Sequence, residues 1–171
     1  LPENFLLYVG NLRKSKNSEG LIQAYLNVRR KMSGLPILVL VGQNFLSTYQ
    51  NGFPEGVRHL GVVGRGDLPA LFARAQFFVF PSYYEGFGLP LIEAMTCGSV
   101  VVASDRGSIP EIVGNAGFTF SLNDIDIFVN CITRLLKNKI YFENIQSLGY
   151  QRSSFFSIEN FILKYTHLYN E

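Results

Sequence analysis

The sequence predicts one α/β domain over residues 1–171, built as a doubly wound parallel sheet of about six strands with helices on both faces. Three observations predict this class. Short apolar segments alternate with amphipathic helical patterns along the chain. Residues 36–41, PILVLV, are apolar throughout, which is typical of a central parallel strand covered on both faces. Hydrophobic residues make up 47% of the chain and charged residues 16%, which favours a folded globular protein.

The first half of the chain alternates strands with helices. Ser18 is a suitable N-cap for the first helix, and Gly34 ends that helix. Asp67 is expected to cap the third helix. In order, the expected elements are a strand at residues 5–9, a helix at about 19–32, a strand at 36–41, a short helix at 44–51, a strand at 57–61 and a helix at 67–75.

The second half is organised around residues 77–102, where the apolar strand FFVF ends at Pro81 and a loop with two glycines follows. Pro90 is expected in the first turn of the next helix, because its missing N–H costs nothing there, and Gly98 ends that helix. The other expected elements are strands at residues 100–103 and 117–120, a short helix that opens at 108–111, and helices at about 123–137, 140–150 and 157–169.

Two polar loops are expected to meet at one crevice. Sheets of this kind bind ligands beyond the carboxyl ends of the strands, where the strand order reverses. The first and fourth strands should flank that point, so the loops at 10–17 and 82–88 should lie together. The second loop leads into a helix N-terminus, whose free N–H groups favour phosphate. The first loop, GNLRKSKN, contributes Gly10, Arg13, Lys14 and Lys16. A diphosphate between the loops would be held from both sides.

Two carboxylates, Glu85 and Glu93, lie eight positions apart in EGFGLPLIE. With the strand before it and the AMTCGSVVVAS run after it, this motif resembles the nucleotide-sugar-dependent retaining glycosyltransferases of family 4. In that family E-G-F-G-x-x-x-x-E lies at the donor site of the C-terminal domain, one of the two Rossmann-like domains of a GT-B enzyme. The resemblance extends from Tyr8 to the last helix and includes SDRGSIPE at 104–111, to which we assign structural roles.

The resemblance implies roles for the basic loop. Lys16 is expected to bind the donor diphosphate, since the Lys-Asn pair at 16–17 matches the family's frequent R-K-N form. The family's arginine is not matched, because Ser15 and Asn11 occupy its positions. Arg13 is the candidate substitute, and a solvated basic loop is an equal alternative for it.

The resemblance also implies that Glu93 accepts hydrogen bonds from the ribose hydroxyls and that Glu85 is the catalytic carboxylate facing the donor sugar. Whether Glu85 acts as a nucleophile or only positions and stabilises the sugar stays open. Loop 61–66 is expected near the nucleotide base. The backbone N–H groups that would stabilise the charge on the leaving phosphate belong to Gly86, Phe87, Gly88 and Leu89. No metal and no other cofactor is expected, because Lys16 and these N–H groups would stabilise the charge on the phosphate.

Other classes fit less well. A dinucleotide site needs G-x-G-x-x-G after the first strand, and here the next glycine after Gly10 is Gly20. A net charge of +2 gives no support for a nucleic-acid surface. Cys97 and Cys131 do not form C-x-x-C, and the two histidines are too scattered for a zinc cluster. No apolar run reaches the length of a membrane span.

We therefore expect the donor-binding domain of a cytoplasmic glycosyltransferase that uses a UDP- or GDP-linked sugar and acts on a glycan or lipid with retention of configuration. Surface polysaccharide biosynthesis is the expected context. The N-terminal acceptor domain is expected to be absent from this chain, and membrane contact is expected only through that half. The alternatives are half of a nucleotide-sugar epimerase and a non-catalytic nucleotide-binding domain.

Overall fold

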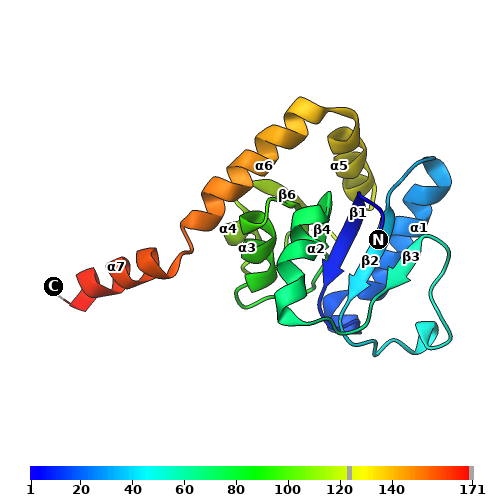
Figure 1. Cartoon of the computed structure of the whole chain (residues 1–171), viewed down its shortest axis with the longest axis horizontal. Coiled ribbons are helices and arrows are strands. Elements are labelled where there is room, and N and C mark those ends of the chain that lie inside the picture. Colours follow the sequence, from blue (N-terminus) through cyan, green and yellow to red (C-terminus); the bar gives the residue numbers. More distant parts are fainter. Residues whose placement is uncertain (123–124, 170–171) are drawn as a thin grey trace.

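The computed structural model describes residues 1–122 and 125–169, and these contain one six-stranded parallel sheet with helices on both faces (Figure 1). The strand order is β3-β2-β1-β4-β5-β6, so the predicted doubly wound sheet is confirmed. The strands are β1 (Phe5–Val9), β2 (Ile37–Val41), β3 (Val57–His59), β4 (Phe77–Phe80), β5 (Val100–Ser104) and β6 (Gly117–Phe120).

The helices are α1 (Ser18–Lys31), α2 (Leu68–Arg74), α3 (Leu89–Thr96), α4 (Ile109–Val113), α5 (Ile125–Lys137), α6 (Lys139–Ser154) and α7 (Ile158–Tyr169). Helices lie in four of the five connections between strands, the connection from β2 to β3 contains only a 3-10 turn, and α5, α6 and α7 follow the last strand. Short 3-10 turns are η1 (Lys14–Lys16), η2 (Ser47–Tyr49) and η3 (Arg65–Asp67). The predicted start of the helix at 123–137 lies outside the described residues.

Each face of the sheet is covered by its own set of helices, apart from α6, whose residues pack against the cores on both faces. Tyr8 of β1 belongs to the core that packs under α1, α5 and α6, and Leu7 belongs to the core that packs under α2, α3 and α4. Both side chains are fully buried. Burial on alternate sides explains why β1, β2, β4 and β5 are apolar at nearly every position.

The strand order reverses between β1 and β4. β1 pairs with β2 along its whole length but pairs with β4 only at Leu6↔Phe77 and Leu7↔Phe78. After β1 the chain continues into α1 on one face, and after β4 it continues into α3 on the other face. The two connections therefore diverge and leave a crevice at the carboxyl ends of both strands.

The short helix predicted at 44–51 is wrong, because the structure has only the 3-10 turn η2 there. The side chain of Asn44 accepts a hydrogen bond from the Leu46 N–H at 3.0 Å and donates to the Tyr49 carbonyl at 3.2 Å. Asn44 also forms a bridge with Leu12. These bonds satisfy backbone groups that a helix would otherwise pair. Asparagine side chains commonly compete with helix formation in this way.

The predicted N-cap role of Ser18 is also wrong. Asn17, in a left-handed conformation with φ 51°, is the N-cap of α1, and Ser18 is the first helical residue. The Ser18 hydroxyl is buried and donates to the Arg13 carbonyl at 3.4 Å instead. Asp67 does precede α2, although its side chain makes no capping bond. Pro90 lies in the first turn of α3 as predicted.

The last helix differs from the others. In Figure 1, α6 lies along the sheet, whereas α7 extends away from it. Phe161, Ile162 and Leu163 of α7 are between 55% and 68% exposed. No described helix has both the length and the apolar character needed to cross a lipid bilayer.

Candidate functional site

A cavity of about 360 Å³ lies at the carboxyl ends of β1 and β4, where the strand order reverses. The basic loop, the glycine loop and the first turn of α3 all contribute to its walls. Its lining residues are Val9, Gly10, Lys16, Phe80, Glu85, Phe87, Gly88, Leu89 and Pro90. The structure therefore brings together six of the predicted site residues in one place.

An ion pair joins the two loops across this cavity. The Lys16 ammonium binds Oε1 of Glu85, and the two side chains are 23% and 13% exposed. Lys16 also lies over the Phe80 ring, 6.0 Å from its centroid. A backbone hydrogen bond from Tyr83 N to the Ser15 carbonyl, at 3.3 Å, ties the same loops together. Partial burial makes this pair stronger than a surface pair of the same geometry.

Segment 104–108 holds the backbone of the Glu85 loop through hydrogen bonds. The Ser108 N–H and hydroxyl both donate to the Glu85 carbonyl, at 3.3 and 3.2 Å, and the hydroxyl lies 3.0 Å from the Phe87 carbonyl. Gly107 has a φ of +58°, and a Cβ there would lie 2.6 Å from the Glu85 carbonyl oxygen. A glycine is therefore required for this close approach.

The N-terminus of α3 opens onto the cavity. Gly88 is the N-cap residue of α3, with φ 92°, and Leu89 and Pro90 form the first turn. Free N–H groups and the positive end of the helix dipole at this turn favour an anion in the cavity. Gly88 supplies the left-handed conformation that the loop-to-helix transition needs.

Gly10 allows a close contact between the ends of β1 and β2. Its N–H donates to the Val41 carbonyl at 2.8 Å, and its own carbonyl lies 2.2 Å from where a Cβ of Gly42 would stand. A Cβ at Gly10 would lie 3.2 Å from the Tyr8 hydroxyl. The contact with Tyr8 therefore favours a glycine at position 10, and Gly10 lines the cavity.

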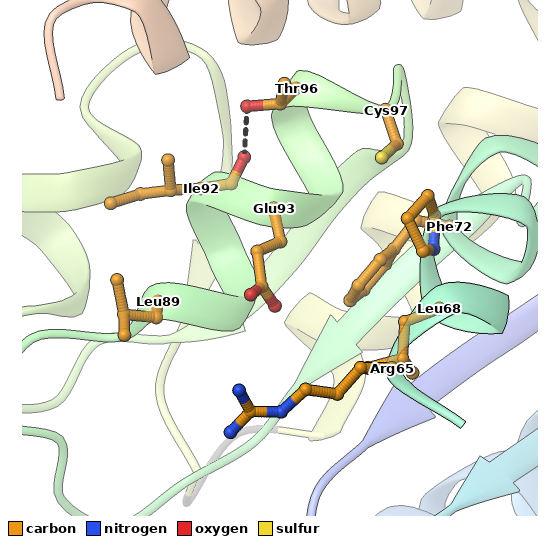
Figure 2. A pocket seen from close by; sticks show the side chains of 9 residues that line it. Arg65, Leu68, Phe72, Leu89, Ile92, Glu93, Thr96 and Cys97 are labelled. Atoms are coloured by element: carbon orange, nitrogen blue, oxygen red, sulfur yellow. Dashed lines mark hydrogen bonds between the residues drawn. The ribbon is translucent and has the colours of Figure 1, made fainter. Parts of the chain in front are cut away.

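A second cavity, of about 490 Å³, lies between α2 and α3 and contains Glu93 (Figure 2). Figure 2 shows the Glu93 carboxylate and the Arg65 guanidinium pointing into the same space, with Phe72 and Leu68 on one side. Leu89 lines both cavities, so the two adjoin at the start of α3. The lining residues are Arg65, Leu68, Pro69, Phe72, Leu89, Ile92, Glu93, Thr96 and Cys97.

Three predicted residues lie outside these walls. Arg13 and Lys14 are exposed, and neither is a lining residue of either cavity. Gly86 is exposed and has no atom within 4 Å of the position a Cβ would take.

Phe87, by contrast, lines the first cavity and is 50% exposed. Its ring packs edge-on against Phe156, with 6.2 Å between the ring centroids.

Sequence reasoning missed other residues of the site. Ser82 donates to Glu85 Oε1 at 3.0 Å, and Arg65 lines the cavity of Glu93. The sequence predicts a structural role for Ser108 but does not identify its partner, the Glu85 carbonyl. The signal available for Ser82 was its position between a strand-ending proline and the glutamate, and the signal for Arg65 was a cation in the loop expected near the base.

Burial affects the titration of groups near the site. Desolvation raises the pKa of the Tyr8 hydroxyl above its ordinary value, and the negative charge of Glu85 adds to the effect. Tyr8 is therefore a neutral hydrogen-bond donor, and it donates to the Asn11 carbonyl at 3.1 Å. Burial, followed by the charge of Glu93, also raises the pKa of the Cys97 thiol. Among the described residues, no three His, Cys, Asp or Glu side chains cluster as metal ligands would.

The chain resembles known proteins over most of its length. It is 38% identical over 165 residues to O-antigen chain mannosyltransferase B of Escherichia coli, covering 92% of this chain and 43% of that protein. Sucrose-phosphate synthase from Thermosynechococcus elongatus superimposes with a TM-score of 0.81 and 27% identity, over 99% of this chain and 46% of that one. The Anabaena protein HepE, solved in complex with UDP-glucose, superimposes with a TM-score of 0.74 and 25% identity, over 88% and 44%.

This chain thus spans less than half the length of each of these three proteins. The family model described as "Glycosyl transferases group 1" matches residues 1–152, which include the entire sheet and both cavities. With the strand order and the EGFG-x4-E segment in place, the chain belongs to the group 1 glycosyl transferases, and its sheet is the Rossmann-like C-terminal domain of a GT-B fold.

Proposed function

We propose that this chain is the donor-binding domain of a retaining glycosyltransferase that takes a sugar from a nucleotide diphosphate sugar. One observation carries the proposal: Lys16, Glu85 and the start of α3 surround a single cavity at the point where the strand order reverses. A cation, a helix N-terminus and a carboxylate at one cavity match the parts of such a donor, which are a diphosphate and a sugar with hydroxyl groups.

The chemistry follows from charge. As the bond between the sugar and the diphosphate breaks, negative charge gathers on the leaving phosphate and positive charge on the sugar ring. Lys16 and the N–H groups of the first turn of α3 would stabilise the phosphate as that charge develops. Glu85 would face the sugar, where a carboxylate stabilises a positively charged ring or attacks it.

The second cavity suits the nucleoside. It adjoins the first at Leu89, and its wall combines apolar side chains with the Glu93 carboxylate and the Arg65 guanidinium. Glu93 would accept hydrogen bonds from the ribose hydroxyls, and the apolar wall formed by Leu68 and Phe72 would contact the base. The similarity to HepE, solved with UDP-glucose, supports a nucleotide sugar as the ligand class.

The acceptor is expected to be a growing glycan or a lipid-linked glycan of a cell-surface polysaccharide. The relative named as an O-antigen chain mannosyltransferase supports this context. A full enzyme would need an N-terminal domain that binds the acceptor, and it would work in the cytoplasm. We therefore expect residues 1–171 alone to bind the donor but to transfer little sugar, and robust transfer by the purified chain would contradict this expectation.

Calorimetric titration of the chain with UDP, GDP, UDP-glucose and GDP-mannose tests the donor site. We expect binding of one nucleoside diphosphate, and we expect Glu93→Ala to weaken it by about tenfold, since one charge-assisted hydrogen-bond acceptor is lost. Glu111→Ala, which changes an exposed first-turn glutamate of α4, is the matched control. Absence of binding by all four ligands, in a chain that melts cooperatively, would overturn the proposal.

The exposure of Arg13 outside the cavity favours one rival, a nucleotide-binding domain without catalysis. The two proposals differ in the role of Glu85. In a transferase, replacement of Glu85 in the full-length enzyme abolishes transfer but preserves nucleotide binding. In a non-catalytic domain, no variant of the full-length protein transfers sugar.

A further inference from the structure

Ser82 lies between the end of β4 and Glu85 and is fully buried. Its hydroxyl donates to Oε1 of Glu85 at 3.0 Å, and its carbonyl accepts a hydrogen bond from Ser104 Oγ at 2.6 Å. Ser104 is the last residue of β5 and is also fully buried. Buried hydroxyls in folded proteins make hydrogen bonds, and here they link the rigid edge of the sheet to a cavity carboxylate.

The contacts of Glu85 are asymmetric. Lys16 and Ser82 both donate to Oε1, and none of the described residues donates to Oε2. The backbone of Glu85 is held separately by Ser108. Two donors on one oxygen orient the carboxylate, and the other oxygen is left for a ligand in the cavity.

We propose that Ser82 is a positioning residue, which fixes the Glu85 carboxylate so that Oε2 faces the donor sugar. This inference rests on the proposed function of the same cavity. Ser82 matters most when the donor is bound, because the diphosphate then competes with Glu85 for Lys16. Ser82 stays in place in that state, because its carbonyl accepts a hydrogen bond from Ser104 and its side chain is fully buried outside the cavity lining.

The test compares binding of a nucleoside diphosphate with binding of the corresponding nucleotide sugar. Calorimetry on the chain with UDP and UDP-glucose, and with GDP and GDP-mannose, gives the ratio of the two dissociation constants. That ratio measures what the sugar adds to affinity. We expect Ser82→Ala to weaken binding of the nucleotide sugar by about tenfold relative to binding of the diphosphate. A loss of this size is expected when one hydrogen bond to a charged group is removed. The affinity for the diphosphate alone should stay within about twofold.

A double-mutant cycle with Glu85→Ala separates positioning from a purely structural role. If Ser82 acts through the carboxylate, the Ser82→Ala/Glu85→Ala double variant binds the nucleotide sugar no more weakly than Glu85→Ala alone. Ser153→Ala is the matched control, because Ser153 is a buried serine on α6 whose hydroxyl donates to the Tyr150 carbonyl at 2.8 Å and which does not line the cavity. Ser82→Thr keeps the hydroxyl and should restore the ratio.

The outcomes distinguish this inference from the proposed function. If the unaltered chain binds no nucleoside diphosphate, both fail. If it binds the diphosphate but the ratio is unchanged in Ser82→Ala, or the cycle is additive, the positioning role fails and the donor site stands. Should Ser82→Ala melt at a much lower temperature, Ser82→Cys replaces it, since a thiol has similar volume but is a weak donor.

Discussion

Lys16 and Glu85 lie 69 positions apart in the sequence and form an ion pair in the cavity at the edge of the sheet. Each partner also has a separate role in the proposed reaction, Lys16 toward the diphosphate and Glu85 toward the sugar. The pair therefore keeps both charges compensated when the cavity is empty. The diphosphate brings its own negative charge, so Lys16 can exchange one anionic partner for another without being left unpaired in a partly buried site.

At the residue scale, Lys16→Ala should weaken binding of the nucleoside diphosphate by about ten- to a hundredfold, because a charge-assisted hydrogen bond contributes about 1.5–3 kcal/mol. Lys14→Ala is the matched control, because Lys14 belongs to the same turn but is exposed and lines neither cavity. We expect the Lys14→Ala variant to bind the nucleoside diphosphate with an affinity within about twofold of that of the unaltered chain. Equal losses in both variants, measured by calorimetry, would mean that the loop acts only through its net charge.

At the scale of elements, the site depends on the contact between segment 104–108 and the loop at 82–88. The loop at 82–88 carries Glu85 and leads into α3, and segment 104–108 after β5 supplies the hydrogen bonds that hold the Glu85 carbonyl. The same two segments contain EGFGLPLIE and SDRGSIPE, two of the motifs that resemble the family. The resemblance identified both segments, but only the structure shows that the second positions the first.

The contact at Gly107 provides a test of this support. Gly107→Ala places a Cβ 2.6 Å from the Glu85 carbonyl oxygen at a φ of +58°, so the Glu85 loop must shift. We expect weaker nucleotide-sugar binding by at least about tenfold and a lower melting temperature. Gly34→Ala is the control, because Gly34 also has a positive φ of +78° but has no atom within 4 Å of its Cβ position.

The control separates backbone strain from the loss of loop geometry. Gly34→Ala should lose about 1 kcal/mol of stability and no affinity. If Gly107→Ala behaves the same way, the contact between segment 104–108 and the Glu85 loop does not matter for the site.

At the scale of the whole molecule, residues 1–122 and 125–157 form the packed unit and α7 extends from it. Met95 of α3 and Ile145 of α6 are buried, whereas the central apolar side chains of α7 are mostly exposed. Phe156, just before α7, is partly buried against the core under α2, α3 and α4. The family match also ends near the end of α6, at residue 152.

Truncation after Ser157 should therefore shift the melting temperature by less than about 4 °C, the order expected for about 1 kcal/mol in a domain of this size. Truncation after Lys137, which also removes α6, should abolish cooperative melting, because it uncovers the buried surface around Met95. Circular dichroism of the two shortened chains distinguishes them. A large loss of stability on removing α7 alone would show that its apolar face packs on the domain in solution.

The sequence by itself determined the class of fold and most element positions, because apolar runs, helical periodicity, proline and glycine act within a few residues of chain. It also indicated which loops meet at the edge of the sheet, through the rule that ligands bind where strand order reverses. Local patterns failed at Asn44 and Ser18, where side-chain hydrogen bonds override the expected helix and cap.

Only the tertiary structure decided which residues of those loops reach the site. Arg13 and Lys16 have similar charge and lie three positions apart, yet only Lys16 lines the cavity. The sequence positions of Ser82 and Arg65 do not by themselves identify site residues; the structure does so by placing the Ser82 hydroxyl on Glu85 and Arg65 in the wall of the cavity that contains Glu93. The physical reason is that a binding site is made by side chains from segments far apart in the chain, and the direction of each one is set by packing that no local pattern encodes.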